Sequence, residues 1–422
     1  MRKQKMKILL TAIIFSFSSM LCAFADDASK EELIDRVSSL ESEIGQLKAM
    51  ISNMQTKQYR VEEKVEKIAA NPVSKTAAIT TGITSKHDVK LYGFLKLDAT
   101  YDDSKTDDVD AARFAQSPST STNEEEFSMT ARNSRIGLNY SGPQENDVKA
   151  VGNLEMDFYD TVSAHHSTQL RMRHAFVELQ YPKWSVLAGQ TGDVFAPLGP
   201  DTLNTNGYLF NGGNMGFRRA QIRLTNNFDI NRDNKITTQL SLNRNGNLND
   251  GPVLEGRTAY TFPFFGRKST VGVEGLYGQD TSVDRVPYWA GGVDVSLALM
   301  DKVSLKGEFF RGANLNDFLA GIGQGINATT NDGIDTVGGW AQLSYKPWDK
   351  YCFNLGYGID SPKKRDLNNG NRSKNEVVLA SVMYSLMKDV KLGLEYSYFQ
   401  TQYLNADEGK NNKITTSVIY SF

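Results

Sequence analysis

The sequence predicts an all-β protein: a 16-stranded antiparallel transmembrane β-barrel, preceded by an α-helical coiled-coil segment. Three observations lead to this fold class. Apolar and polar residues alternate with a period of two from about residue 89 to the end of the 422-residue chain. The connections between these alternating segments are short and long in turn, and a heptad repeat of apolar residues precedes them.

Residues 1–25 are typical of a secretory signal peptide. A basic start is followed by a short apolar run and an Ala-Phe-Ala cleavage site at 23–25. A membrane anchor is the alternative, although the apolar run is short for one. The formal net charge of the chain is −2, and removing the four cations of the signal leaves −6. Because such a chain lacks a basic surplus, no nucleic-acid partner is expected.

Residues 26–70 carry the heptad repeat and are predicted to form a periplasmic coiled coil. An amphipathic helix packed on its own domain is the alternative, but the period of 3.5 favours several chains. β-Branched residues at a and Leu at d favour two strands, whereas Gln58 and Met54 leave the number open. Residues 71–88, rich in Ala, Ser and Thr, are predicted to be a flexible linker. The apolar positions are Leu33, Val37, Leu40, Ile44, Leu47, Ile51, Met54, Val61, Val65 and Ile68.

Residues 89–422 are predicted to form the outer-membrane barrel, with one face of each strand toward lipid and the other toward water. Short connections such as 181–183 and 300–302 alternate with long ones such as 191–216 and 312–334. A soluble β-sandwich would share the alternation, but this asymmetry and the charged second face favour a barrel. The sixteen predicted strands are 90–101, 131–140, 149–158, 169–181, 184–190, 217–225, 235–244, 253–262, 269–277, 287–299, 303–311, 335–346, 351–360, 376–386, 390–399 and 413–422.

The last strand ends with an aromatic residue, Phe422, on the same face as Tyr420 and Val418. This face is expected to meet lipid, with the terminal ring in the interfacial aromatic girdle. The strand must pair with the first one, because a barrel in lipid leaves no open edge. An aromatic C-terminus of this kind resembles the signal read by bacterial barrel-assembly machinery.

The channel face carries both charges, and its arginines gather on the even-numbered strands. In "LRMRHAFVEL" the alternation slips near His174, which predicts a bulge that lets Arg171 and Arg173 both point inward. In "FRRAQIRL", Arg219 and Arg223 are expected to point inward and Arg218 to lie on the opposite face. The full inward set is Lys96, Arg135, Glu155, Asp157, Arg219, Arg223, Arg257, Glu274, Asp294, Lys306, Glu308 and Glu395.

The segment 191–216 is long and Gly-rich, yet it also contains Phe195, Leu198, Tyr208 and Phe210. Such a loop is expected to fold into the lumen, because its apolar residues are unfavourable in water. It would form a constriction that orients small anions. The alternative is that the arginines only pair with acids and stiffen the wall. The candidate constriction residues are Arg171, Arg173, Arg219, Arg223, Arg135 and Arg257, with Asp193 and Asp201 on the loop.

Neither a catalytic site nor a metal or cofactor is predicted. Cys352 would be the sole thiol after signal cleavage, and of the four histidines only His165 and His166 are adjacent. The sequence contains no G-x-S-x-G, H-E-x-x-H or glycine-rich phosphate loop. An outer-membrane lipase or protease is therefore disfavoured.

Three stretches carry a family resemblance: "KLYGFLKLDATYD", "ARNSRIGLNYSGP" and "HAFVELQYPKWSVLAGQTGDVFAPLGPDTLNTNGYLF", the last running into "GGNMGFRRAQIRL". At these residues the sequence resembles the DcaP-like porins of Gram-negative outer membranes. The resemblance implies a sixteen-stranded homotrimer with an N-terminal periplasmic coiled coil, and uptake of small anionic solutes, dicarboxylates in particular. The leading hypothesis for the function is a passive channel that favours anions. The trimer departs from the two-strand preference of the heptads. An envelope-organising or adhesive protein that acts through its coiled coil is the alternative function.

Overall fold

The computed structural model describes residue 45 and residues 88–159, 168–246, 250–282 and 285–422. Every strand lies in one compact unit, residues 84–422. The predicted signal peptide and coiled coil, and the linker up to residue 87, lie outside the described residues, apart from Gly45. These three predictions therefore stay predictions.

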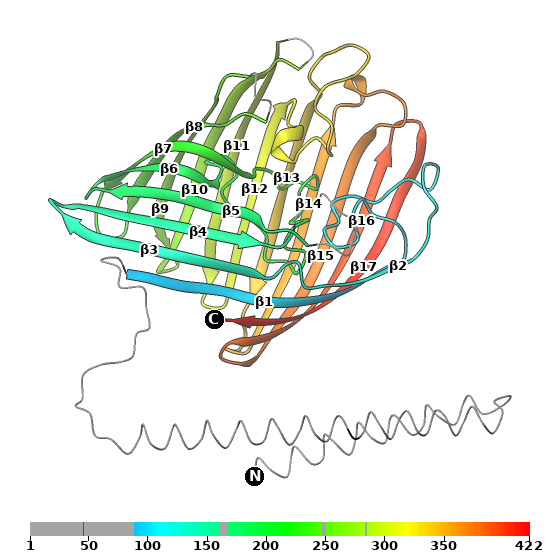
Figure 1. Ribbon diagram of the computed structural model, residues 1–422. Coiled ribbons are helices and arrows are strands. Elements are labelled where there is room, and N and C mark those ends of the chain that lie inside the picture. The colour runs from blue at the N-terminus through cyan, green and yellow to red at the C-terminus, as the bar shows by residue number, and fades with distance from the viewer. Residues whose placement is uncertain (1–44, 46–87, 160–167, 247–249, 283–284) are drawn as a thin grey trace. The chain divides into compact units, whose positions relative to one another are not determined.

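One antiparallel sheet of seventeen strands makes the wall (Figure 1). β2 and β3 pair with successive parts of β1, so together they form a single interrupted wall strand. The predicted number of sixteen wall strands is thereby confirmed. The strands are β1 (Asp88–Asp102), β2 (Glu126–Thr130), β3 (Arg135–Glu145), β4 (Val148–Asp157), β5 (Arg171–Gln180), β6 (Trp184–Gly192), β7 (Arg218–Asp229), β8 (Lys235–Asn243), β9 (Val253–Phe264), β10 (Arg267–Asp280), β11 (Val286–Met300), β12 (Val303–Ala313), β13 (Asp335–Tyr345), β14 (Tyr351–Pro362), β15 (Arg372–Met387), β16 (Val390–Tyr403) and β17 (Ala406–Ser421).

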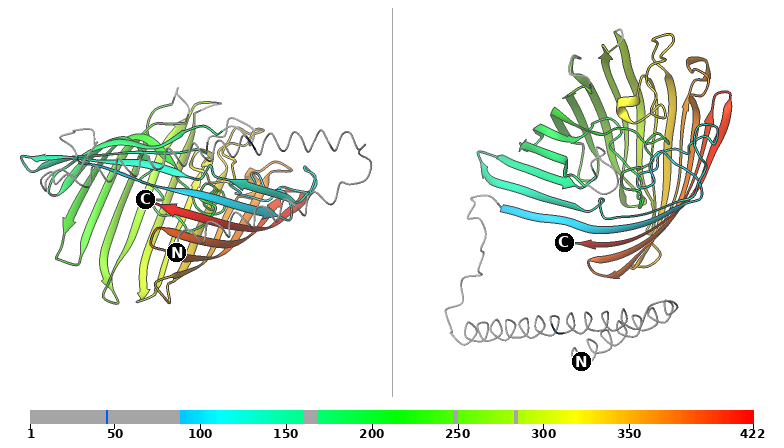
Figure 2. Two further views of the ribbon diagram at one scale, coloured as in Figure 1. Left: turned by 60° about the horizontal axis from the view of Figure 1, so that its bottom comes forward. Right: turned by 45° about the vertical axis from the view of Figure 1, so that its right-hand side comes forward.

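The wall is closed, because the last strand pairs with the first. β17 runs antiparallel to β1 from Phe94↔Ser421 to Asp102↔Lys413, and the two strands lie side by side in Figures 1 and 2. The backbone N–H of Phe422 donates to the carbonyl of Gly93 at 3.0 Å, and the N–H of Gly93 donates back at 3.1 Å. A side chain at Gly93 would meet the Phe422 ring. Closure leaves the sheet without an open edge.

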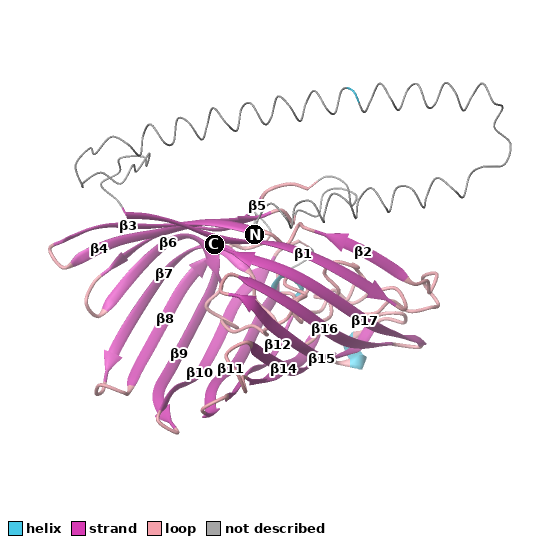
Figure 3. Ribbon diagram, turned by 90° about the horizontal axis from the view of Figure 1, so that it is seen from below, coloured by secondary structure: helices cyan, strands magenta, loops and turns pink. Residues whose placement is uncertain are grey.

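The predicted lipid and water faces are confirmed on the closing strands. The outward Leu95 and Val418 are 59% and 49% exposed, whereas the inward Lys96 and Asp98 are each 3% exposed. Within the described barrel, helical residues form only two short 3-10 turns, η2 (Asn316–Phe318) and η3 (Lys364–Asp366) (Figure 3). No helix among the described residues is long and apolar enough to cross a bilayer.

Several strand boundaries differ from those predicted, and the largest difference is on the last strand. β17 begins at Ala406 rather than 413, and only residues 404–405 connect it to β16. Its first half was missed because its outward residues, including Lys410 and Asn412, are polar, so both faces look alike in the sequence. The short strand β2 was not predicted, and residues 131–134, which were predicted to begin the strand 131–140, instead separate β2 from β3.

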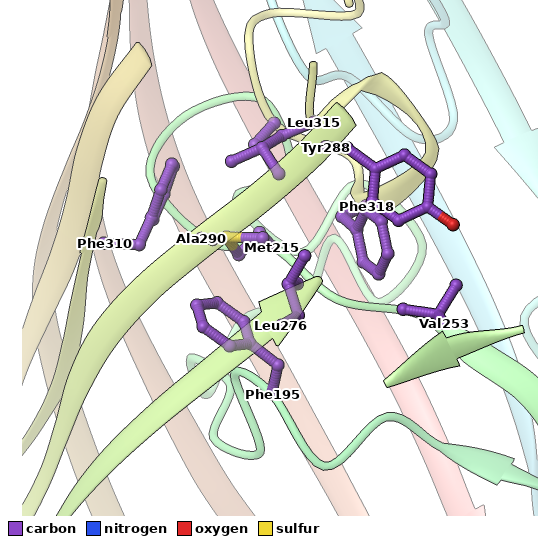
Figure 4. Packing of buried hydrophobic residues seen from close by; sticks show 10 residues of the cluster. Phe195, Met215, Val253, Leu276, Tyr288, Ala290, Phe310, Leu315 and Phe318 are labelled. Atoms are coloured by element: carbon purple, nitrogen blue, oxygen red, sulfur yellow. The ribbon is translucent and has the colours of Figure 1, made fainter. Parts of the chain in front are cut away.

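The apolar core lies inside the barrel, between the wall and three loops. Phe195 and Met215 of the segment between β6 and β7 pack on Leu276 and Phe310 of the wall and on Phe318 (Figure 4). A second cluster joins this segment and the loop after β1 to the far wall, and its members are Ala112, Ala115, Leu209, Trp340, Val377, Leu379 and Phe399. Burial of these groups holds the loops in the lumen.

Candidate functional site: an arginine-lined constriction

The segment 193–217, hereafter the inner loop, is fixed in the lumen by side chains from much of the wall. Three buried glutamates, on β9, β12 and β16, accept hydrogen bonds from its backbone and from one of its hydroxyl groups. Charge-assisted bonds of this kind are among the stronger ones in proteins. The bonds run from Val194 and Phe195 N–H to Glu255 Oε2 (2.7 and 3.1 Å), from Leu198 N–H to Glu308 Oε1 (2.6 Å), from Leu203 N–H to Glu395 Oε2 (2.9 Å) and from Thr202 Oγ1 to Glu395 Oε1 (2.6 Å).

A cavity of about 670 Å³ lies between the inner loop and the wall strands β3 and β5. Arg135, Arg171 and Arg173 line it from the wall, as the strand alternation predicts. The predicted bulge is confirmed, because the pairing of β4 with β5 shifts register between Glu155 and Met156. Folding of the inner loop into the lumen is confirmed as well.

The wall arginines share two carboxylates on β4. Arg171 binds Asp157 through two bonds of 2.9 and 2.6 Å. Arg173 donates to Glu155 at 2.7 Å and to Asp157 at 2.8 Å, and the Arg135 Nε lies 3.4 Å from Glu155. Three guanidinium groups therefore face two carboxylates, which leaves one positive charge in excess on this part of the wall. The arrangement stiffens the wall and keeps it cationic at the same time.

Aromatic rings support the same arginines. The guanidinium carbon of Arg135 lies 5.2 Å from the ring centroid of Phe94, and that of Arg171 lies 5.4 Å from the centroid of Tyr159. Arg171 also donates to the side-chain oxygen of Asn206 on the inner loop at 2.6 Å. These contacts fix the guanidinium planes at the cavity surface.

The three other predicted arginines point inward but do not line this cavity. Arg219 pairs with Asp193 at 3.2 Å, and its guanidinium carbon lies 4.0 Å from the ring centroid of Phe318. Arg223 donates to Gln221 at 2.9 Å and to the carbonyl of Gly192. Arg257 forms two bonds to Asp294 on β11, of 2.8 and 2.7 Å. These residues brace the strands and the base of the inner loop.

Both predicted acids line the cavity, but cations from outside the lining compensate each of them. Asp193 is buried, pairs with Arg219 and accepts the Phe217 N–H at 2.9 Å. Asp201 is exposed and lies 3.0 Å from the Lys306 ammonium group. The acidic side of the constriction is therefore weaker than the sequence suggests.

The sequence interpretation missed several lining groups. Arg218, expected on the opposite face, lines the same cavity, because it is the first residue of β7, where the alternation is only beginning. Loop 103–125 contributes Arg113 and Asp108 to the lining. The alternation of inward and outward residues applies to strands, so it could not predict the position of these loop residues. Burial raises the pKa of Tyr208, so this residue lines the cavity as a neutral phenol. Within the described residues, no group of three His, Cys, Asp or Glu side chains could hold a metal ion.

Comparison with known proteins places these features in a family. The family model described as Gram-negative porin matches residues 68–403. The crystal structure of the outer membrane channel DcaP of Acinetobacter baumannii is 22% identical, with a TM-score of 0.65 over 81% of this chain and 99% of that one.

Two further solved structures share the fold. An anion-selective porin from Comamonas acidovorans is 12% identical, with a TM-score of 0.55 over 80% of this chain and 100% of that one. The trimer form of OmpT from Vibrio cholerae is 12% identical, with a TM-score of 0.52 over 80% and 99% of the two chains. No curated protein matches the sequence. The family match over most of the sequence, together with the closed barrel and its inner loop, shows that the chain belongs to the Gram-negative porins, the channel proteins of the outer membrane.

Proposed function

We propose that the channel passes small solutes by passive diffusion and favours small anions, dicarboxylates among them. The excess of guanidinium groups over carboxylates at the constriction carries this proposal. The resemblance to the DcaP-like porins and the shared fold of an anion-selective porin support it.

In this proposal the inner loop and the wall arginines have separate tasks. The inner loop narrows the lumen, so a passing solute comes close to Arg135, Arg171 and Arg173. Their positive charge raises the local anion concentration, and their N–H groups replace water around a carboxylate as it enters. Arg can bind a carboxylate through two parallel bonds, which also orients the solute.

Reversal potentials of the purified protein in a planar bilayer test this function. In a potassium chloride gradient, the sign of the potential is expected to indicate chloride preference, because the constriction carries surplus positive charge. A panel of mono- and dicarboxylate salts then ranks the solutes. Cation preference, or no conductance at all, would contradict the proposal.

We also propose a homotrimer whose N-terminal coiled coil extends into the periplasm. The heptads of residues 26–70 support association, and the fold is shared with a porin solved in a trimer form. Light scattering in detergent is expected to give about three chain masses for the full-length mature protein. A single chain mass under mild detergent would refute the trimer.

A further inference from the structure

Arg218 differs from the other arginines of the cavity in how it is held. Its guanidinium carbon lies 4.5 Å from the ring centroid of the preceding residue, Phe217, and both residues line the cavity. Within the described part of the chain, Arg218 forms no ion pair. Arg135, Arg171 and Arg173 instead all contact Glu155 or Asp157.

This difference bears on the charge that a solute meets. A carboxylate that holds a guanidinium group also cancels much of its charge. An aromatic ring holds the cation through its quadrupole and carries no net charge, so the full positive charge remains. Arg218 therefore adds a positive charge to the one supplied by the wall arginines, and Asp108 is the lining carboxylate without an ion pair in the described residues that offsets part of this sum.

The backbone at this point is fixed on both sides. The Phe217 N–H donates to the Asp193 carboxylate at 2.9 Å, and the Asp193 N–H donates to the Phe217 carbonyl at 3.0 Å. The preceding residue, Gly216, has φ +89° and donates its N–H to the Phe318 carbonyl at 2.8 Å. Arg218 thus starts from a constrained position at the end of the inner loop.

We propose that Arg218 is a specificity-determining residue of the channel and that Phe217 positions its guanidinium group at the cavity surface. The inference rests on the proposed anion preference and names, among the arginines that line the cavity, the one whose charge is least compensated. A unit charge about 5 Å from a passing anion raises its local concentration about four-fold in the dielectric of water. Salt screening lowers this figure. Arg218→Gln is expected to lower the anion-to-cation permeability ratio about two- to four-fold.

The test compares full-length variants by reversal potential in planar bilayers under a potassium chloride gradient. Arg218→Gln removes the charge, and Arg218→Met supplies a second neutral variant should the first fail to insert. Arg223→Gln is the matched control, since Arg223 is on the same strand but outside the cavity lining. Arg218→Lys is expected to retain the preference in chloride, because it keeps the charge.

The role of Phe217 has its own pair of variants. Phe217→Leu should lower the anion-to-cation permeability ratio toward that of Arg218→Gln. Phe217→Tyr should retain the wild-type ratio, because Tyr keeps an aromatic face and Leu does not. A Phe217→Leu channel with the wild-type ratio would overturn the positioning role.

The outcomes separate this inference from the proposed function. A wild-type channel without anion preference would overturn both. An anion-preferring wild type whose ratio is unchanged in Arg218→Gln would overturn only the role of Arg218. A loss in Arg218→Gln that Arg223→Gln does not share supports the inference.

Discussion

Replacing Arg135, Arg171 and Arg173 together by glutamine is expected to turn an anion-preferring channel into a cation-preferring one. The change removes three positive charges and leaves Glu155 and Asp157 at the same constriction. The wall then carries two negative charges, which exceed the single charge of Arg218. The reversal potential in a salt gradient should change sign.

A companion variant tests whether misfolding, rather than the loss of charge, causes this result. Removing the arginines leaves two buried carboxylates without cations, which costs about 3–5 kcal/mol for a broken buried pair. Adding Glu155→Gln and Asp157→Asn removes that penalty and makes the wall neutral. This five-fold variant is expected to keep only the weaker anion preference that the charge of Arg218 supports, without acquiring cation preference.

The matched control changes inward arginines that lie away from the cavity, Arg223→Gln and Arg257→Gln. These should leave the sign and size of the reversal potential close to those of the wild type. If the control loses anion preference as strongly as the triple variant, selectivity arises elsewhere in the lumen, and the assignment to the cavity between the inner loop and β5 is wrong.

Combining Glu308→Ala with Glu395→Ala is expected to raise single-channel conductance and weaken selectivity. These side chains hold the Leu198 and Leu203 N–H groups and the Thr202 hydroxyl. Each buried donor left without an acceptor costs about 1–3 kcal/mol, so the middle of the inner loop should leave the wall. A wider lumen carries more current and brings fewer solutes close to the arginines.

The comparison variant for the loop is Glu376→Ala. Glu376 also bonds to neighbours, namely Lys374 and Tyr357, but these contacts lie on the outer face of β15 and β14. Its conductance in a planar bilayer should equal that of the wild type. Wild-type conductance in the double variant as well would mean that the apolar clusters alone keep the inner loop in place.

Much of the fold could be predicted from the sequence because one physical requirement repeats along the chain. Lipid accepts Leu95 and Val418 but excludes Lys96 and Asp98. Each strand therefore alternates between apolar residues that face lipid and polar residues that face the lumen. The inner loop could be predicted from the same requirement, because Phe195 would be unfavourable in water and is fully buried.

The details of the site depend on contacts between distant segments, which a single sequence does not display. Asp193 was expected to face the solute, yet Arg219 across the loop base neutralises it. Strand parity did not place Arg218 at the cavity, because it is the first residue of β7 and pairs with Gly192 at the end of the β6–β7 ladder, next to the inner loop. Asp108 reaches the site on a loop that is held by apolar packing. Alternation predicts which side of the wall a residue faces, but it does not predict which oppositely charged residue pairs with it.

The anchors of the inner loop also set an order of assembly. Val194 binds Glu255 on β9, 61 residues further along the chain, whereas Thr202 binds Glu395 on β16, 193 residues further along. The loop cannot complete its contacts until nearly the whole chain has been threaded into the wall. The constriction therefore forms last, and an incompletely assembled barrel would be a wide pore that lacks it.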